Sequence, residues 1–160
     1  FNQDIGSWDI SSLTSAGFLF FNGGTNYGST QYGNLLNGWI QSPIINNSVS
    51  LYMGSNKYPS TSVASRNLFV NTIGSISVSN CADNGSGLIR VTTATHSLST
   101  NDKVRINSVV GTTEANGLWS VTVINTTTID LIGSTFTNTY ISGGSVVTGY
   151  GWTITDGGAL

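Results

Sequence analysis

Hydrophobic and polar residues alternate over a long stretch in the second half of the chain. In an extended chain, residues 118–124 would place Trp119, Val121 and Val123 on one side and Leu118, Ser120, Thr122 and Ile124 on the other. This period of two predicts a β-strand. Similar runs with turn residues roughly every 8 to 15 positions are typical of a small β-barrel or sandwich. The expected strands are residues 75–80, 88–93, 103–109, 118–124, 127–132 and 140–147.

The pattern before this region is helical. Within residues 31–41, apolar side chains recur at the spacing of an amphipathic helix, at Tyr32, Leu35, Leu36 and Trp39. Pro43 is expected to end this helix. A second helix is predicted for residues 62–70, with the hydroxyl of Ser60 or Thr61 as its N-cap.

Two short strands are predicted outside the barrel region, at residues 49–53 and 152–155. The second is aromatic and β-branched, and Asp156-Gly157-Gly158 stops it. A terminal strand needs a partner, so we expect it to pair with residues 49–53 across the second helix, as a strand-helix-strand unit. Roughly 80 residues separate this helix from the last strand, whereas connections are usually a few residues long.

The β-rich region is therefore expected to be a separate module inserted into a small first domain. The predicted domains are residues 1–73, the inserted β-barrel 74–148, and the closing strand in residues 149–160. The expected fold is mainly β or α+β, with a strand-helix-strand cap and an inserted small antiparallel β-barrel.

The first 21 residues fit neither a clean strand nor a clean helix. Their apolar residues fall at Phe1, Ile5, Trp8, Ile10 and Leu13. This spacing indicates one coil of a solenoid, with a short strand at residues 8–10 that turns at Ser11 and Ser12 into a helical turn. A single coil cannot bury its own apolar face. We therefore expect four residues to be buried against the next unit, namely Phe18, Leu19, Phe20 and Phe21.

Composition narrows the possible functions. Charged residues make up 8% of the chain, where about 25% is usual. With a net charge of −2 and a pI near 4.9, the chain has no electrostatic footprint for nucleic acid. The single Cys81 excludes an intrachain disulfide and a multi-cysteine metal site. No apolar run is long enough to insert in a membrane. Because the chain begins at Phe1 inside what looks like a repeat, we expect it to be a fragment.

Residues 1–14 read FNQDIGSWDISSLT and resemble a BspA-like surface repeat, a variant of leucine-rich repeats. Four later blocks resemble the unit that closes such arrays: LLNGW at 35–39, GSNKY at 54–58, ASRNL at 64–68 and GWTITDGG at 151–158. In that family the last two blocks nearly touch, and here the β-rich region separates them. The resemblance implies a short leucine-rich-like solenoid cap. The chain departs from the family in having one repeat before the cap, and phenylalanine and leucine where methionines are usual.

The β-rich region carries a second resemblance. Its blocks ATHSLSTNDKV at 94–104, NGLWSV at 116–121 and TTIDL at 127–131 are similar to a small β-barrel module of phage structural proteins. That module is named for its likeness to the first catalytic-cysteine half-domain of ubiquitin-activating enzymes. Asn101 stands where the module usually has glycine. The name implies no thioester chemistry here, because Cys81 lies outside the matched blocks.

Candidate chemical groups are few. His96, the only histidine, is expected to be structural and to cap the turn before Lys103. Asp4 and Asp9 could form a carboxylate pair or bind calcium, but such residues are more often turn formers. Residues 83–87 (DNGSG) suggest a hairpin loop more than a calcium loop. Cys81 is expected to be a half-exposed cysteine at a strand end. We expect no cofactor, no metal and no catalytic residue.

Aromatic residues are the candidates for binding. The six tyrosines, at 27, 32, 52, 58, 140 and 150, exceed what the expected core needs, and we expect them at the surface. Tyr27 and Tyr140 lie in loops rich in glycine, serine, asparagine and threonine, where aromatic faces beside amides can stack on sugars. The predicted ligand-binding residues are Tyr27, Asn26, Tyr140 and Asn138. The alternative is that these tyrosines pack where the module joins the cap.

Together the two resemblances imply a non-enzymatic receptor-binding or adhesion tip of a phage tail fibre or virion spike. The expected partners are a glycan or protein receptor on a bacterial surface and other virion subunits. A homo-oligomer, with a trimer favoured, is expected on the virion surface, because such assemblies are symmetric. Two alternatives remain open: a secreted or cell-surface bacterial adhesin segment, and a purely structural virion decoration protein.

Overall fold

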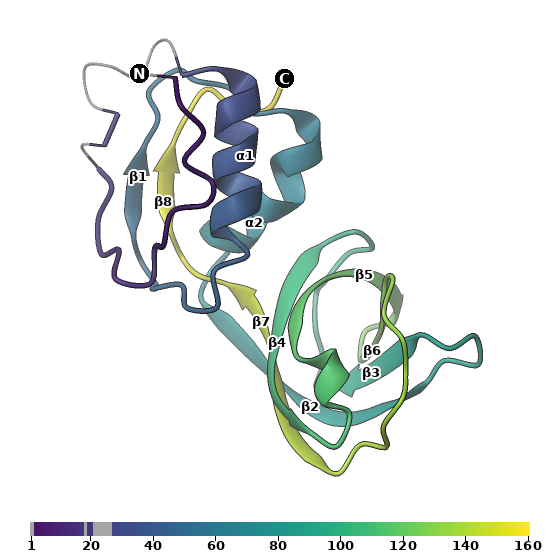
Figure 1. Ribbon diagram of the computed structural model, residues 1–160. Coiled ribbons are helices and arrows are strands. Elements are labelled where there is room, and N and C mark those ends of the chain that lie inside the picture. The colour runs from purple at the N-terminus through teal and green to yellow at the C-terminus, as the bar shows by residue number, and fades with distance from the viewer. Residues whose placement is uncertain (1, 18, 21–26) are drawn as a thin grey trace. The chain divides into compact units, whose positions relative to one another are not determined.

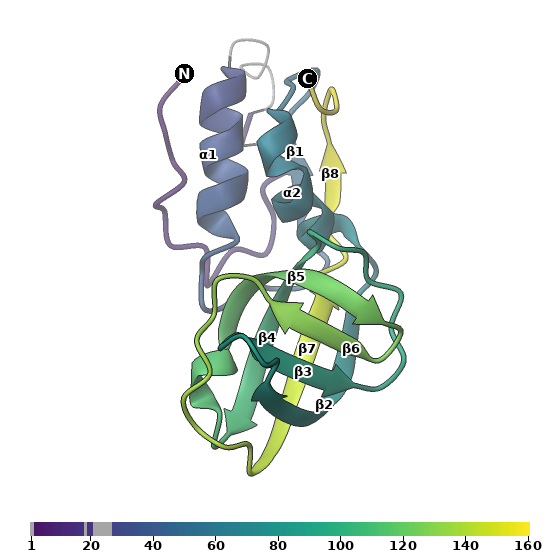
Figure 2. The ribbon, with the colours of Figure 1, turned by 90° about the vertical axis from the view of Figure 1, so that its right-hand side faces the viewer.

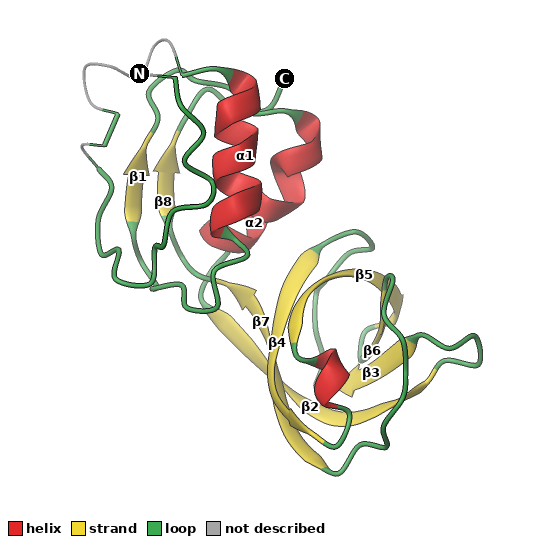
Figure 3. Cartoon of the chain, in the orientation of Figure 1, coloured by secondary structure: helices red, strands yellow, loops and turns green. Residues whose placement is uncertain are grey.

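The computed structural model describes residues 2–17, 19–20 and 27–160 (Figure 1). The chain forms two compact units. We call Phe1–Thr72 together with Tyr150–Leu160 the first unit, and Ile73–Gly149 the second unit. In the described residues the fold is mainly β, with a closed six-stranded antiparallel barrel and two α-helices (Figure 3). The mainly β fold and the barrel were both predicted and are confirmed.

The second unit is the barrel. Its strands are β2 (Gly74–Asp83), β3 (Ile89–Thr93), β4 (Lys103–Val110), β5 (Gly117–Asn125), β6 (Thr128–Leu131) and β7 (Ser142–Gly149). Around the barrel the order is β2, β3, β6, β5, β4, β7, which closes the sheet on itself (Figure 2). Every neighbouring pair is antiparallel. Closure leaves no strand edge without a partner along the barrel wall. All six predicted strands are present.

The predicted alternation of buried and exposed side chains on β5 is also correct. Val121 is fully buried in the barrel interior, and Trp119 and Val123 pack against the same cluster. Ile124, on the opposite side of the strand, is 46% exposed. The interior is filled by aliphatic residues from all six strands, among them Val91, Val104, Ile106, Ile129, Leu131 and Val146.

The first unit contains α1 (Ser29–Trp39), β1 (Ser50–Tyr52), the short 3₁₀ helix η2 (Ser60–Ser62), α2 (Val63–Val70) and β8 (Thr153–Thr155). β1 and β8 pair in parallel, with Leu51 opposite Ile154. This is the predicted pairing of the last strand across the second helix. An isolated parallel bridge also joins Ala16 to Leu51 on β1.

Both predicted helices are present, and α1 buries the predicted apolar side, Tyr32, Leu35, Leu36 and Trp39. The predicted N-cap of the second helix is wrong. Neither Ser60 nor Thr61 caps α2, because both lie in the preceding 3₁₀ turn. Ser62 occupies the N-cap position without a capping bond. Its hydroxyl instead accepts a hydrogen bond from Nδ2 of Asn37 on α1.

The strand predicted at residues 8–10 does not form. The segment is a series of turns, in which the backbone N–H of Trp8 donates to the carbonyl of Ile5 and that of Leu13 to the carbonyl of Ile10. Asp4 and Asp9 each accept a hydrogen bond from the backbone N–H two residues further on. Such local bonds compete with strand pairing. The predicted turn-forming role of the two aspartates is therefore confirmed.

The predicted burial of residues 18–21 is only partly met. Phe20 is buried, but Leu19 is 44% exposed, so its predicted burial is wrong. Phe18 and Phe21 lie outside the described residues, as does Phe1.

Aromatic residues from distant parts of the chain build the core of the first unit. The rings of Phe69 and Trp152 lie 4.5 Å apart, and Trp39 contacts Trp152 edge to face. Both indoles keep their N–H groups bonded, since Nε1 of Trp39 donates to the carbonyl of Ile5 and Nε1 of Trp152 to that of Asn46. The final strand is therefore part of the same core as α1. Neither α1 nor α2, the helices seen in the described ranges, is long and apolar enough to span a membrane.

Candidate binding sites

Tyr27 is not the exposed aromatic that we expected. It is 3% exposed, and its ring lies 4.7 Å from that of Phe20. Burial raises the pKa of Tyr27 to about 12, and the negative charge of Asp4 adds to the shift. Asn26 lies outside the described residues. Tyr27 lies two residues before α1, and its ring packs against Phe20 instead of facing solvent.

The other tyrosines show the same trend. Tyr32, Tyr58 and Tyr150 are buried, so their predicted surface location is wrong, whereas Tyr52 is exposed. The buried rings pack against one another or against core aromatics, as when Tyr58 meets Tyr32 edge to face. The tyrosines of the first unit are therefore mostly core residues.

Tyr140 and Asn138 lie together in the loop between β6 and β7. Tyr140 is half-buried against the barrel core, and its hydroxyl lies 2.9 Å from the carbonyl oxygen of Gly143. Asn138 is exposed, and its carbonyl accepts a hydrogen bond from the hydroxyl of Thr112. The structure thus brings two of the four predicted binding residues into one loop, while Tyr27 belongs to the other unit.

Glu114 holds this loop in place. It lies in the 3₁₀ helix η3 (Thr113–Ala115). Its carboxylate accepts four hydrogen bonds, from the backbone N–H and hydroxyl of Thr137 and from the backbone N–H and Nδ2 of Asn138. Burial alone would raise the pKa of Glu114, but these hydrogen bonds outweigh it and the pKa falls to about 2. Sequence reasoning missed this residue, because it is 23 positions from the loop.

Two aliphatic side chains are exposed beside the same loop. Ile141 is 72% exposed and Val110 is 48% exposed, and the N–H of Ile141 donates to the carbonyl of Val110. Gly111 has a φ of +91°, and a Cβ there would collide with the backbone of Thr139. The residues Val110, Asn138, Thr139, Tyr140 and Ile141 are called the barrel loop surface below. It combines a preformed backbone with an exposed apolar centre and polar neighbours.

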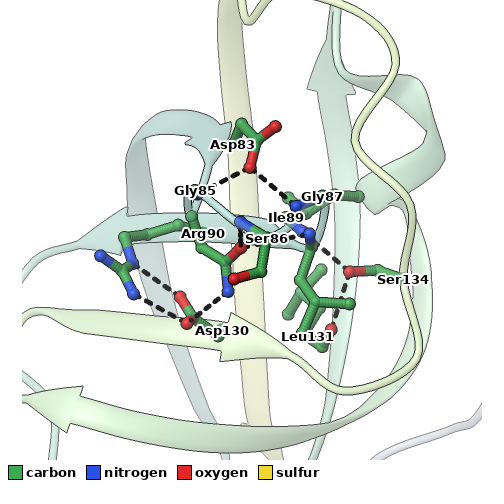
Figure 4. Close-up of polar contacts among 11 residues, drawn as sticks. Asp83, Gly85, Ser86, Gly87, Ile89, Arg90, Asp130, Leu131 and Ser134 are labelled. Atoms are coloured by element: carbon green, nitrogen blue, oxygen red, sulfur yellow. Dashed lines mark hydrogen bonds and ion pairs between the residues drawn. The ribbon is translucent and has the colours of Figure 1, made fainter.

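The hairpin loop between β2 and β3 is structural. Oδ1 of Asp83 accepts hydrogen bonds from the backbone N–H groups of Gly85 and Gly87 (Figure 4). Oδ1 of Asn84 accepts from the N–H groups of Ser86 and Leu88. The side chains thus satisfy the loop's own backbone, which confirms the hairpin interpretation of this segment.

An ion pair ties this hairpin to the neighbouring strand. The guanidinium of Arg90 on β3 donates to both carboxylate oxygens of Asp130 on β6, at 2.7 and 2.8 Å (Figure 4). Nδ2 of Asn84 donates to the same carboxylate. The hydrogen bond from Arg90 lowers the pKa of Asp130. Nearby, the hydroxyl of Ser134 accepts from the N–H of Ile89 and donates to the carbonyl of Leu131. These contacts connect β3 to β6 and to the loop that follows β6.

His96 and Cys81 are both buried. Nδ1 of His96 accepts a hydrogen bond from the N–H of Leu98, in agreement with the predicted turn-capping role, and burial lowers the pKa of its imidazole. Cys81 is buried rather than half-exposed, so that prediction is wrong. Burial, with the charge of Glu114, raises its pKa to about 11, which disfavours the reactive thiolate. Within the described ranges, His, Cys, Asp and Glu form no group of three or more that could hold a metal ion.

A groove in the first unit was not predicted. Two adjoining hollows of about 590 and 530 Å³ share Gly6, Ser7, Gly38 and Gln41 in their walls. We call them the N-terminal groove; its walls are formed within residues 4–11 and 34–44. The two walls approach closely because both carry glycine, and a Cβ on Gly38 would collide with the backbone of Gly6. Trp8, which is 52% exposed, lines the second of these hollows and not the first.

No protein-family model matches the chain, and no curated protein matches it. The function is therefore inferred from the geometry of the described residues and from the resemblances in the sequence.

Proposed function

We propose that the chain is a non-enzymatic receptor-binding or adhesion segment of a phage tail fibre or virion spike. The barrel would present the barrel loop surface to a protein or glycan on a bacterial surface. The proposed location is the virion surface, and the proposed partners are that receptor and other virion subunits.

The observation that carries this proposal is the preformed loop. Four hydrogen bonds to Glu114 and one from Thr112 hold residues 137–138, so binding there costs little ordering entropy. The centre of the surface is apolar, at Ile141 and Val110, and its neighbours are polar. An apolar centre with a polar rim is typical of protein-binding surfaces.

The viral assignment rests on the resemblance of residues 94–131 to a phage structural module. Phage attachment proteins act in many copies, so weak single contacts add up to stable attachment. We propose a homo-oligomer for this reason, with a trimer favoured. The solution mass by light scattering tests this part, and a monomer at all concentrations would argue against it.

We also propose that the first unit is the closing part of a leucine-rich-like solenoid. Three observations support this. Ala16, β1 and β8 lie side by side in parallel, in the order of the chain. A helix separates each from the next, α1 and then α2. The first 14 residues resemble a BspA-like repeat. These same features favour the second candidate function, a cell-surface or secreted bacterial adhesin segment.

A cell-binding assay with one pair of variants tests the proposed receptor contact. The purified chain, labelled with a fluorophore, is incubated with a panel of bacteria, and bound fluorescence is measured by flow cytometry. We expect Ile141→Asp to abolish binding, because it places a charge at the apolar centre. Ile124→Asp is the matched control, because Ile124 is an exposed isoleucine on β5 of the same barrel and is not part of the barrel loop surface.

Two results would argue against the proposed function. Equal loss of binding in both variants would place the contact elsewhere. Hydrolysis of a host polysaccharide, lost on changing Asp4, Asp9 or Asp130, would show an enzyme instead.

A further inference from the structure

The N-terminal groove combines an exposed aromatic face with polar walls. Trp8 exposes half of its surface and lines the second hollow, as does the exposed Ile44 from the other wall. The polar residues Asp9, Ser11 and Gln41 line the same hollow. Each hollow, at about 530 and 590 Å³, falls within the roughly 300–1,000 Å³ of small-molecule sites.

We propose that this groove binds a neutral oligosaccharide, with one sugar ring stacked on the indole of Trp8. The apolar face of a pyranose ring suits a flat aromatic surface. Its hydroxyl groups need both donors and acceptors around the ring edge. Gln41 supplies both, and the carboxylates of Asp4 and Asp9 supply acceptors. This site lies in the first unit and does not depend on the barrel loop surface.

The charges in the walls select against acidic sugars. The two walls contain Asp4 and Asp9 and no lysine or arginine. The hydrogen bond from the backbone N–H of Ser11 lowers the pKa of Asp9, which keeps this carboxylate ionised. A uronic or sialic acid would bring a third negative charge beside these two, and like charges at close range repel. A neutral sugar meets no such penalty.

The groove is also preformed. Oδ2 of Asp4 accepts a hydrogen bond from Nδ2 of Asn34, which ties one wall to α1. Nε1 of Trp39 donates to the carbonyl of Ile5 beneath the same wall. The contact of Gly6 with Gly38 holds the walls at a fixed separation. A rigid site spends little of its binding energy on ordering itself.

A printed array of neutral oligosaccharides and their sialylated or uronic-acid counterparts tests the proposal on the 160-residue chain. We expect binding to neutral members and none to the acidic counterpart of the same backbone. The best neutral oligosaccharide is then titrated by calorimetry. Binding confined to acidic glycans, or to no neutral glycan on the array, would overturn the proposal.

Variants locate the site. We expect Trp8→Ala to weaken the affinity for the neutral glycan by about tenfold or more, which corresponds to about 1.4 kcal/mol. Trp8→Phe keeps an aromatic face and should retain most of the affinity. Tyr52→Ala, an exposed aromatic of the same unit outside the groove walls, is the control. Equal affinity in Trp8→Ala and Tyr52→Ala would refute the stacking role.

A second pair separates sugar binding from a purely structural role of the groove. Gln41→Ala should lose affinity, whereas Gln31→Ala, on the first turn of α1, should not. Asp9→Asn should keep the neutral glycan and gain binding to its acidic counterpart. If Trp8→Ala changes only the self-association of the chain, measured by light scattering, the groove is a protein interface and the proposal fails.

Discussion

Replacing Asp156 with alanine should destabilise the first unit strongly. Asp156 directly follows β8, and its side chain is 4% exposed. Its carboxylate accepts a 2.6 Å hydrogen bond from the hydroxyl of Tyr32 and a 2.7 Å bond from Nε of Arg66. The group therefore links the end of the chain to both α1 and α2. Burial and the charge of Asp156 raise the pKa of Tyr32, so its hydroxyl stays protonated and able to donate.

The expected cost is about 3 kcal/mol. Removing one partner of a buried ion pair costs about 3–5 kcal/mol, because the other charge is left buried without compensation. The side chain of Arg66 retains 19% exposure, so water can reach part of the guanidinium. That places the loss near the lower limit of this range. The hydroxyl of Tyr32 loses its acceptor in the same variant.

Urea unfolding followed by tryptophan fluorescence measures this loss. Trp39 and Trp152 report on the first unit, and Trp119 reports on the barrel. A Trp119→Phe background isolates the first transition. We expect Asp156→Ala to lower the midpoint of that transition and to leave barrel circular dichroism unchanged.

A double-mutant cycle with Arg66→Met gives the decisive result. The two substitutions share one interaction, so their effects should fall short of additivity by more than about 0.5 kcal/mol. Full additivity, or a loss below about 1 kcal/mol for Asp156→Ala, would refute the reasoning that this carboxylate locks the final strand.

Three further outcomes are expected. The stability that Glu114 supplies is present above its ordinary pKa of 4.5 and is lost as the pH falls towards 2, so the protection factors of the amides of residues 137–138 against hydrogen exchange should fall in that window. Glu114→Gln should show low protection of these amides at every pH. His96 is buried with a lowered pKa, so barrel stability should decrease as the pH falls below 6.5, and denaturation of His96→Gln should show a weaker pH dependence. Gly38→Ala should cost about 1–3 kcal/mol through overpacking, measured by urea unfolding. Gly17→Ala, whose Cβ would meet only ordinary contacts, should cost less.

Sequence patterns predicted the elements whose signal is local. The period of two in β5 and the helical spacing of α1 both depend on neighbours within a few residues, and both were correct. The pairing of β1 with β8 followed from the instability of a lone terminal strand. The inferences about β5 and α1 needed no knowledge of distant contacts.

The features that were missed depend on contacts between distant residues. Tyr27 was expected at the surface because its neighbours in the sequence are polar. In the structure it is buried, and its ring packs against Phe20. Glu114 and Thr137 are 23 positions apart in the sequence, and only the folded barrel brings them together. The strand expected at residues 8–10 does not form, because the carboxylate of Asp9 accepts a hydrogen bond from the backbone N–H of Ser11, and hydrophobic spacing cannot reveal such a local bond. The N-terminal groove forms where Gly6 approaches Gly38, which composition alone does not indicate.

The way the barrel begins and ends has a consequence for the order of folding. Gly74 at the start of β2 pairs with Gly149 at the end of β7. Once the barrel has formed, these ends are only about 5 Å apart, as in any antiparallel pair. Before that, pairing of β1 with β8 must close an unstructured connection of about 100 residues, whereas a folded barrel leaves only about 25 of them flexible, which lowers the entropic cost by about 1 kcal/mol. We therefore expect the barrel to form first and its formation to speed the pairing of β1 with β8.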